Sequence, residues 1–247
     1  MFNLDGRTAL VTGAGQGVGF GIAEVLIEAG AAVLVNDLNP DRAEAAATAL
    51  GSFARALPFD VSDYAAVCAA AESAGTIDIL VNNAGIPPSM RARPFRELEP
   101  ADWVPYIDVN LYGVLNCVKA TIDQMCDRKW GRVITISSGA GTQGLGIGVS
   151  AYAAGKGAGI SFMRHLAVEC GRSGVTANTL ALGLMVRATD GADEASRTVT
   201  SRMASTVPVG RLGTGRDAGT ACVYLASDEA SWITGQTIGL NGGSATS

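Results

Sequence analysis

Residues 7–19 read RTALVTGAGQGVG, a short apolar run that leads directly into four closely spaced glycines. Apolar residues at helical spacing follow from residue 22 to residue 29, so the stretch predicts a strand, a glycine-rich turn and a helix. Glycines let a backbone approach a pyrophosphate closely, and the free N–H groups at the start of a helix attract an anion. The spacing is Gly-x-x-x-Gly-x-Gly and no Lys-Ser/Thr pair follows, which favours a dinucleotide site over a P-loop. The expected cofactor contacts in this turn are Gly13, Gln16, Gly17, Val18 and Gly19.

A second apolar run, residues 32–37 (AVLVND), ends in a carboxylate 24 residues after Gly13. In a strand–helix–strand unit this places Asp37 beside the adenosine ribose, where a carboxylate accepts hydrogen bonds from the 2′-OH and repels a 2′-phosphate. The alternative is that Asp37 only caps the helix that begins near Pro40. We expect Asp37 and the neighbouring Leu38 to contact the ribose.

The residues around this second run predict that NAD(H) is preferred over NADP(H). Neither Gln16 nor Leu38 supplies the positive charge that a 2′-phosphate needs. Asn36 and Asn39 could hydrogen-bond a phosphate, and Arg42 could reach back from the next helix, so these three residues could weaken the preference.

Five further segments have the pattern of strands, and they alternate with helical segments such as the alanine-rich residues 63–74. The alternation predicts an α/β fold in which a parallel sheet of about seven strands has helices on both faces, with residues 1–247 forming a single domain. The five segments are residues 55–60, 77–83, 131–138, 174–181 and 235–240. Ligands bind at the carboxyl edge of such a sheet, although Asn and Gly are also the usual turn residues. The expected cofactor contacts at this edge are Asp60, Val61, Asn83, Ala84 and Gly85.

Tyr152 and Lys156 are four residues apart, so on a helix their side chains diverge by only ~40° and share one face. A cation beside a phenol favours the phenolate, and the pKa of the phenol can then fall from ~10 towards neutral pH. Ser138, at the end of the strand predicted over residues 131–138, could hydrogen-bond a substrate oxygen near Tyr152. Asn110, a polar residue in a long apolar helix, could hold a water or a carbonyl near Lys156. The alternatives are a solvated Tyr–Lys pair and a structural amide.

Composition excludes several other classes of protein. The 247 residues carry a net charge of −5 with a pI near 4.9, which argues against nucleic-acid and anionic-membrane partners. Five cysteines without a C-x-x-C spacing suggest neither a disulfide framework nor a zinc site, and the single His165 should point away from the Lys156 face. Because neither a signal peptide nor a run of 18 apolar residues is recognisable, we expect a soluble cytoplasmic protein.

Two segments have the composition of mobile parts of an active site. Residues 139–150 (GAGTQGLGIGVS) are glycine-rich and uncharged, which predicts an adaptable loop over an uncharged or partly apolar substrate. Residues 184–208 are polar and lack a strong apolar period. Because long irregular segments in compact domains are often functional, we expect them to form a lid.

Taken together, the motifs resemble the short-chain dehydrogenase/reductase family over essentially the whole chain. Residues 12–19 match its T-G-x-x-x-G-x-G turn, residues 82–85 its N-N-A-G, and residues 152–156 its Y-x-x-x-K. Residues 233–236 and 241–243 look like its C-terminal pattern. The resemblance implies a doubly wound Rossmann fold.

The resemblance also implies roles for four residues. Tyr152 would be the acid–base, Ser138 would orient the substrate oxygen, Lys156 would bind the nicotinamide ribose and lower the tyrosine pKa, and Asn110 would anchor a proton-relay water.

The chain departs from the family pattern after the strand predicted over residues 174–181. Leu182-Gly183 replaces the usual Pro-Gly, and Arg187 replaces a threonine, which puts contacts to the nicotinamide carboxamide and the pyrophosphate in doubt. We still expect Gly183 and Met185 to contact the cofactor. Arg187 would contact a pyrophosphate or a substrate anion, or it is a solvated arginine.

The favoured function is an NAD-dependent oxidoreductase that interconverts a secondary alcohol and a ketone. A 3-oxoacyl-carrier-protein reductase is the main alternative, with Arg128, Lys129 and Arg172 as docking cations. An epimerase or dehydratase with tightly held NAD, and a non-catalytic dinucleotide-binding protein, are further alternatives. Small residues over 152–159, the apolar helix around Asn110 and the resemblance predict a homotetramer.

Overall fold

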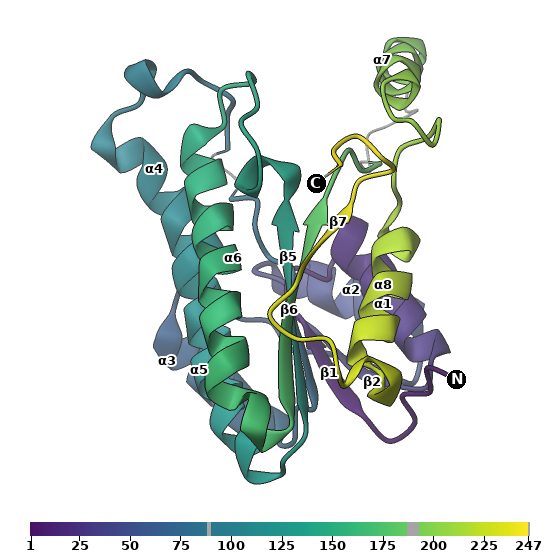
Figure 1. Cartoon of the computed structure of the whole chain (residues 1–247). Helices are drawn as coiled ribbons and strands as arrows, with labels where there is room; N and C mark the ends of the chain where they lie inside the picture. The colour runs from purple at the N-terminus through teal and green to yellow at the C-terminus, as the bar shows by residue number, and fades with distance from the viewer. Residues whose placement is uncertain (88–89, 187–192, 247) are drawn as a thin grey trace.

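The computed structural model describes residues 1–87, 90–186 and 193–246, and within them one sheet of seven parallel strands. The strand order is β3-β2-β1-β4-β5-β6-β7, so the chain starts near the middle of the sheet and winds outward in both directions (Figure 1). This is the predicted doubly wound Rossmann fold, and its order reverses between β1 and β4, where open sheets bind ligands. The strands are β1 (Thr8–Val11), β2 (Ala32–Val35), β3 (Ala54–Ala56), β4 (Ile79–Asn82), β5 (Gly131–Ser138), β6 (Val175–Leu182) and β7 (Thr237–Leu240).

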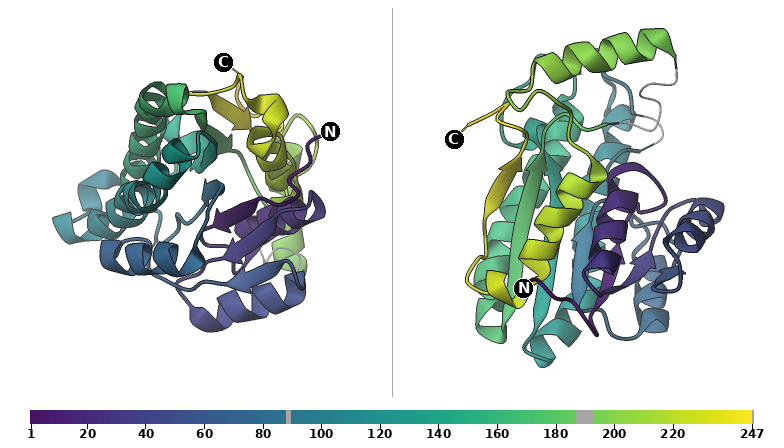
Figure 2. Two further views of the ribbon diagram at one scale, coloured as in Figure 1. Left: turned by 90° about the horizontal axis from the view of Figure 1, so that it is seen from below. Right: turned by 90° about the vertical axis from the view of Figure 1, so that its right-hand side faces the viewer.

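Helices cover both faces of the sheet, as Figures 1 and 2 show. One face carries α1 (Gly17–Glu28), α2 (Pro40–Leu50) and α8 (Gly215–Ala226). The other carries α3 (Tyr64–Ala74), α5 (Gly113–Asp127) and α6 (Ser150–Cys170), and α4 (Pro100–Ile107) packs against α6. A hydrophobic core lies on each face of the sheet, and successive strand residues pack into the two cores alternately. Ala9 and Val11 pack into the core beneath α1, α2 and α8, and Leu10 packs into the core on the opposite face. Both faces are therefore apolar, which is why these strands read as continuous hydrophobic runs.

The third strand is shorter than predicted. The sequence suggested residues 55–60, whereas β3 covers Ala54–Ala56. Pro58 lacks an N–H group and cannot continue the ladder, so the pairing with β2 ends after Leu57 N donates to Val35 O.

The long helix predicted around Asn110 is interrupted. A five-residue π-helical segment, Asp108–Tyr112, joins α4 to α5. Pro105, inside α4, has no N–H to donate to the preceding turn. The Asn110 side chain donates to Tyr106 O at 2.9 Å. Such widened turns are frequent at functional sites, and this one sets the position of Asn110.

Residues 184–208 were predicted to be irregular, but they contain α7 (Glu194–Ser205). The Asp193 side chain accepts a hydrogen bond from Ser196 N and caps it, and the helix stands beyond the carboxyl ends of the strands (Figure 1). The helix escaped prediction because its sequence is polar on most sides and carries no apolar stripe. Among the described helices, none combines the length and apolarity that crossing a bilayer requires.

Candidate active site

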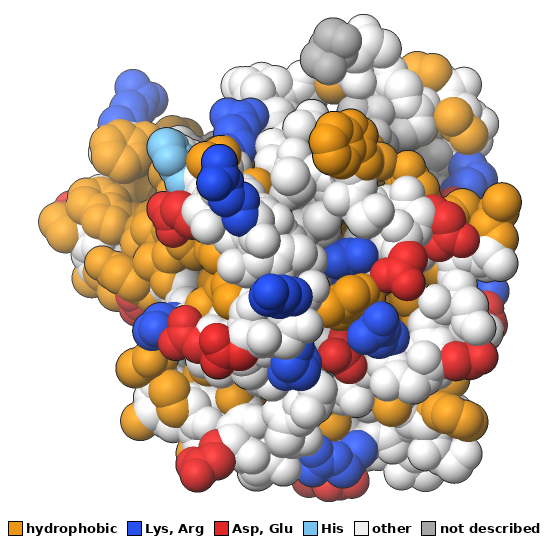
Figure 3. All heavy atoms as spheres, turned by 60° about the horizontal axis from the view of Figure 1, so that its bottom comes forward, with side chains coloured by type: hydrophobic (Ala, Val, Ile, Leu, Met, Phe, Trp, Pro, Cys, Tyr) orange, Lys and Arg blue, Asp and Glu red, His pale blue; other side chains and the backbone are white. Residues whose placement is uncertain are grey.

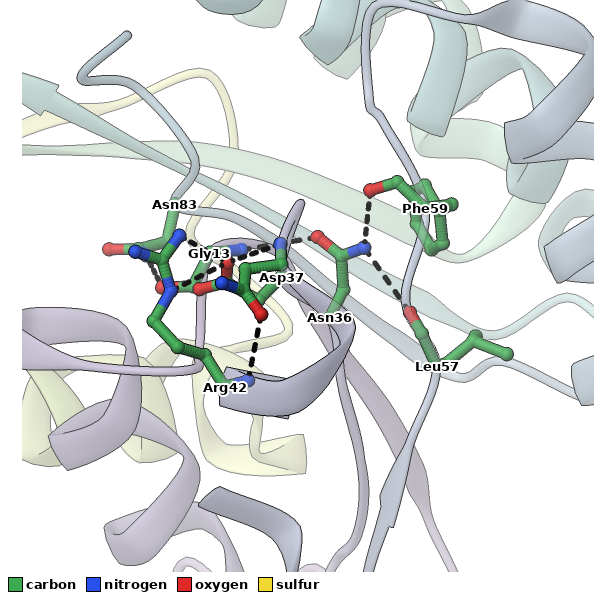
Figure 4. A network of polar contacts seen from close by, with 8 residues as sticks. Gly13, Asn36, Asp37, Arg42, Leu57, Phe59 and Asn83 are labelled. Atoms are coloured by element: carbon green, nitrogen blue, oxygen red, sulfur yellow. Dashed lines mark hydrogen bonds and ion pairs between the residues drawn. The ribbon is translucent and has the colours of Figure 1, made fainter. Parts of the chain in front are cut away.

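The glycine turn is fixed by a network centred on the buried side chain of Asn36 (Figure 4). Its Oδ1 accepts a hydrogen bond from Gly13 N at 3.2 Å, and its Nδ2 donates to the carbonyls of Leu57 and Phe59 at 3.2 and 3.0 Å. One amide thus joins the segments that follow β1, β2 and β3. Because both amide hydrogens of Asn36 are engaged inside the chain, Asn36 offers no donor to a phosphate. Its structural role was missed from the sequence, although a polar residue directly after a buried run was the available signal.

Asn83 ties the end of β4 to the same turn. Its Nδ2 donates to Thr12 O at 2.8 Å and to Gly13 O at 3.1 Å, while Thr12 Oγ1 accepts from the N–H groups of Asn83 and Ala84. A Cβ at Gly13, where φ is +63°, would lie 3.0 Å from Ala84 Cα. The close approach of these two segments therefore requires glycine at position 13.

The start of α1 suits a phosphate group. The N-cap residue Gln16 makes no side-chain cap, and the first turn holds no acidic residue. The first N–H groups of a helix lack intrahelical partners, so they can donate to an anion. At Gly17 φ is +59° and nothing lies within 4 Å of an added Cβ, so the backbone is open to the cavity there.

Asp37 follows β2 and is buried. Its Oδ1 accepts from Asn39 N at 2.9 Å and from Arg42 Nε and Nη2 at 3.1 and 2.7 Å. The N-cap of α2 is Asn39, whose side chain accepts from Arg42 N at 3.2 Å. The alternative that Asp37 is itself the helix cap is therefore wrong, and Arg42 does reach back from α2 (Figure 4).

Ser138 and Tyr152 meet at the carboxyl end of β5. Ser138 is the last residue of the strand, and its Oγ accepts from Ala140 N at 3.2 Å, while Tyr152 lies in the first turn of α6. Burial raises the pKa of Tyr152, and the hydrogen bond with Ser138 opposes that shift. The expected fall of this pKa is not found, because loss of solvation outweighs the favourable contacts of the phenolate.

Lys156 is buried one turn further along α6. Its Nζ donates to Ile136 O at 2.7 Å and lies 5.9 Å from the centroid of the Tyr152 ring. Burial lowers its pKa to about 8. A Cβ at Gly85 would collide with this ammonium and lie 2.9 Å from Asn110 Oδ1, which has no hydrogen-bond partner. Lys156 and Asn110 therefore border one small space beside Gly85, as the sequence suggested.

Gly155 allows the helix that carries Tyr152 and Lys156 to approach the π-helical segment. A Cβ at Gly155 would lie 2.9 Å from both Asn110 Cβ and Tyr106 O. At least this part of the small-residue stripe is thus used within the chain.

A cavity of about 670 Å³ joins the glycine turn to the Ser138–Tyr152 pair. Every residue predicted to contact the cofactor lines it, whereas Asn110 lies behind the wall. Those residues are Gly13, Gln16, Gly17, Val18, Gly19, Asp37, Leu38, Asp60, Val61, Asn83, Ala84, Gly85, Tyr152, Lys156, Gly183 and Met185. Sequence reasoning missed several apolar lining residues, among them Ile86, Pro87 and Val186. The glycine cradle and the N-terminus of α1 fit a dinucleotide cofactor.

Asp60 and the segment after β6 differ in detail from what the sequence suggested. The Asp60 carboxylate accepts from Ser62 N and Ser62 Oγ at 2.8 and 2.7 Å, so the oxygen Oδ1 already has partners. Leu182, which replaces the usual proline, is the buried last residue of β6, and Arg187 lies outside the described residues.

Comparison with known proteins agrees with this geometry. A family profile described as enoyl-(acyl carrier protein) reductase matches residues 13–245. The chain is 38% identical over 245 residues to 3-oxoacyl-[acyl-carrier-protein] reductase FabG of Escherichia coli (strain K12), covering 98% of each chain.

Solved structures show the same likeness. A gluconate 5-dehydrogenase of Burkholderia cenocepacia J2315, in complex with NADP and tartrate, superposes with a TM-score of 0.88 at 36% identity, covering 98% of this chain and 96% of that one. A 3-oxoacyl-[acyl-carrier protein] reductase of Brucella melitensis ATCC 23457 gives a TM-score of 0.90 at 31% identity, covering 99% and 94%. With this agreement over nearly its full length, the chain belongs to the short-chain dehydrogenase/reductase family, the NAD(P)-dependent oxidoreductases of CH–OH and C=O groups.

Proposed function

We propose that this enzyme interconverts a secondary alcohol and a ketone with NAD(H), using Tyr152 as the general acid–base. The observation that carries the proposal is that Ser138, Tyr152 and Lys156 line the same cavity as the glycine turn. When bound, the nicotinamide supplies or accepts the hydride. Tyr152 exchanges a proton with the substrate oxygen, and Ser138 Oγ holds that oxygen by a hydrogen bond.

The protonation states support this division of labour. Because burial raises the pKa of Tyr152, its phenol is protonated at neutral pH and suited to donate to a ketone oxygen. Lys156 is assigned to the nicotinamide ribose, since its ammonium lies on the cavity wall and is oriented by Ile136 O. The free Oδ1 of Asn110 can accept from a water beside Gly85, which would return a proton to this site.

NAD(H) is the proposed cofactor in preference to NADP(H). The Asp37 carboxylate lines the cavity at the end of β2, where it accepts hydrogen bonds from a ribose diol and repels a phosphate. The solved gluconate 5-dehydrogenase holds NADP, so the proposal of NAD(H) rests on the residues of this chain alone.

The substrate is proposed to be an uncharged or partly apolar carbonyl compound. Ile86, Pro87 and Val186 line the cavity, and Leu145 and Ile147 are exposed on the loop beyond Ser138. Residues 184–208 are the proposed lid; residues 187–192 of this range lie outside the described residues, and α7 stands over the carboxyl edge of the sheet.

A 3-oxoacyl thioester is the second candidate substrate, favoured by the identity with the Escherichia coli reductase. Of the proposed docking cations, however, Arg128 binds Gln124 Oε1, Ile77 O and Asp78 Oδ1. That arginine therefore has a structural role at the end of α5, which weakens the carrier-docking hypothesis. Membership of an oxidoreductase family argues against the non-catalytic alternative, and the relatives compared above are reductases and a dehydrogenase, not epimerases or dehydratases.

Self-association into a tetramer is also proposed. Several apolar side chains on the α4–α6 side are exposed, including Val104, Tyr112 and Val168. Figure 3 shows hydrophobic side chains gathered on this side, near the single histidine.

The test is turnover of a panel of ketones, 3-oxoacyl thioesters and secondary alcohols with NAD(H), comparing the wild type with Tyr152→Phe. This change removes the hydroxyl and little volume, so we expect turnover to be abolished while NAD binding stays within about twofold. Tyr224→Phe on α8, outside the cavity lining, is the matched control and should keep full activity. Near-normal turnover by Tyr152→Phe would exclude the assigned acid–base.

A further inference from the structure

The guanidinium of Arg42 stands beside the carboxylate that is proposed to exclude a 2′-phosphate. Its Nη2 lies 2.7 Å from Asp37 Oδ1, and its side chain is 45% exposed whereas that of Asp37 is 6% exposed. Both residues line the cavity, next to Gln16 and Leu38. A cation that can still move into solvent is thus paired with a buried anion at the expected ribose position.

The pair is held by the local fold. Asn39 donates its N–H to Asp37 Oδ1 and accepts from Arg42 N, which fixes the spacing between the end of β2 and the first turn of α2. A Cβ at Gly15 would lie 2.5 Å from Asp37 Oδ2 and 3.0 Å from Arg42 Cβ. The glycine turn therefore packs directly against the pair, and a group on the adenosine ribose would lie within reach of both side chains.

The hydrogen bonds divide the two oxygens of Asp37. Asn39 N and the Nε and Nη2 of Arg42 donate to Oδ1, while Oδ2 points towards Gly15. Oδ2 is the oxygen placed to accept from a ribose hydroxyl. At the same time, Arg42 partly cancels the negative charge that would repel a phosphate.

We propose that Arg42 is a second cofactor-selecting residue, whose guanidinium Asp37 withholds from the 2′-phosphate of NADP(H). The inference rests on the proposed use of NAD(H) at this site. Removing the charge of Asp37 releases a guanidinium that can bind a phosphate through two parallel N–H donors. Removing Arg42 leaves the carboxylate unpaired, and its repulsion of a phosphate grows.

The experiment is calorimetric titration of the full-length protein with NAD⁺ and with NADP⁺. The variants are Asp37→Asn, Arg42→Ala and the double variant. Asparagine keeps an oxygen that accepts from Asn39 N, so the turn is preserved, and Asp37→Ser serves as a second neutral replacement. Asp41→Asn is the matched control, because it removes the same charge from the first turn of α2 at an exposed position outside the cavity lining.

We expect Asp37→Asn to bind NADP⁺ at least about tenfold more tightly than the wild type, and the double variant to lose that gain. Arg42→Ala should weaken NADP⁺ binding about fivefold or more while NAD⁺ binding changes little. An equal gain for NADP⁺ with and without Arg42, or no gain in either neutral replacement of Asp37, would overturn the role of Arg42 while leaving NAD use intact. A wild type that binds neither dinucleotide would instead overturn the proposed function, and this inference with it.

Discussion

Gly85→Ala should lower the activity of the enzyme by displacing a side chain that the substitution does not itself alter. The backbone at Gly85 does not need a positive φ, so alanine is allowed there by conformation. Its methyl group would nevertheless collide with Lys156 Nζ and lie 2.9 Å from Asn110 Oδ1. Lys156 is buried and hydrogen-bonded to Ile136 O, so it can make room only by giving up that contact.

The magnitude follows from the interaction that is lost. A hydrogen bond from a charged donor contributes about 1.5–3 kcal/mol, which corresponds to a fall in kcat/KM of roughly 10- to 150-fold if the position of the ammonium matters for turnover. Binding of NAD⁺ should weaken in parallel, because Lys156 is assigned to the nicotinamide ribose. Steady-state kinetics and calorimetry measure the two effects separately.

A double-mutant cycle identifies the route of the effect. If Gly85→Ala acts through Lys156, then adding Lys156→Ala should produce little further loss, so the two losses are strongly non-additive. Gly171→Ala is the control, because nothing lies within 4 Å of an added Cβ there and φ is not positive. Wild-type kinetics in Gly85→Ala, or fully additive losses, would refute the assigned position and role of the ammonium.

Two further predictions concern stability and assembly. Burial lowers the pKa of Lys156 from 10.5 to about 8, so the penalty for burying its charge is complete below pH 8 and relieved as the pH rises through 10.5. Urea titrations of the wild type and of Lys156→Met measure this effect. The free energy of unfolding of the wild type, relative to that of Lys156→Met, should rise by about 3 kcal/mol between pH 7 and pH 10.5. Equal changes of the unfolding free energy with pH in the two proteins would contradict this. Light scattering at micromolar concentration should show a tetramer, with Val168→Asp on the exposed face of α6 shifting it towards smaller species; a monomeric wild type would contradict the tetramer.

The sheet could be predicted because its determinants are local. Each strand of a parallel sheet covered on both faces is an apolar run, and the polar residue after it marks the carboxyl edge. Asp37, Asn83 and Ser138 stand at such positions, and the structure brings all three to one cavity. The exact match of β5 with residues 131–138 has the same origin, since all of its residues except Ser138 are buried.

The interrupted helix around Asn110 could not be predicted from apolar spacing alone. An apolar period near 3.6 does not distinguish a continuous helix from one that widens by a residue. The widening is visible in the contacts it creates: Asn110 donates to Tyr106 O, and Gly155 of α6 packs against both residues. The sequence pattern therefore indicates Asn110 as a polar residue in an apolar helix. Its position beside Lys156 depends on packing between segments more than forty residues apart in the chain.

The pKa shifts and ion pairs of the site were the hardest features to predict from residue spacing, because they depend on how deeply each group is buried. Tyr152 and Lys156 lie on one helix as predicted, yet both groups shift towards their neutral forms, since loss of solvation penalises phenolate and ammonium alike. The charge of Asp37 was evident from the sequence. Its pairing with Arg42 was not, because that pairing depends on how the turn at Asn39 directs the first residues of α2. A carboxylate at the end of β2 is thus insufficient to define cofactor choice, because the effective charge that a 2′-phosphate meets is set by the carboxylate together with the cation held against it.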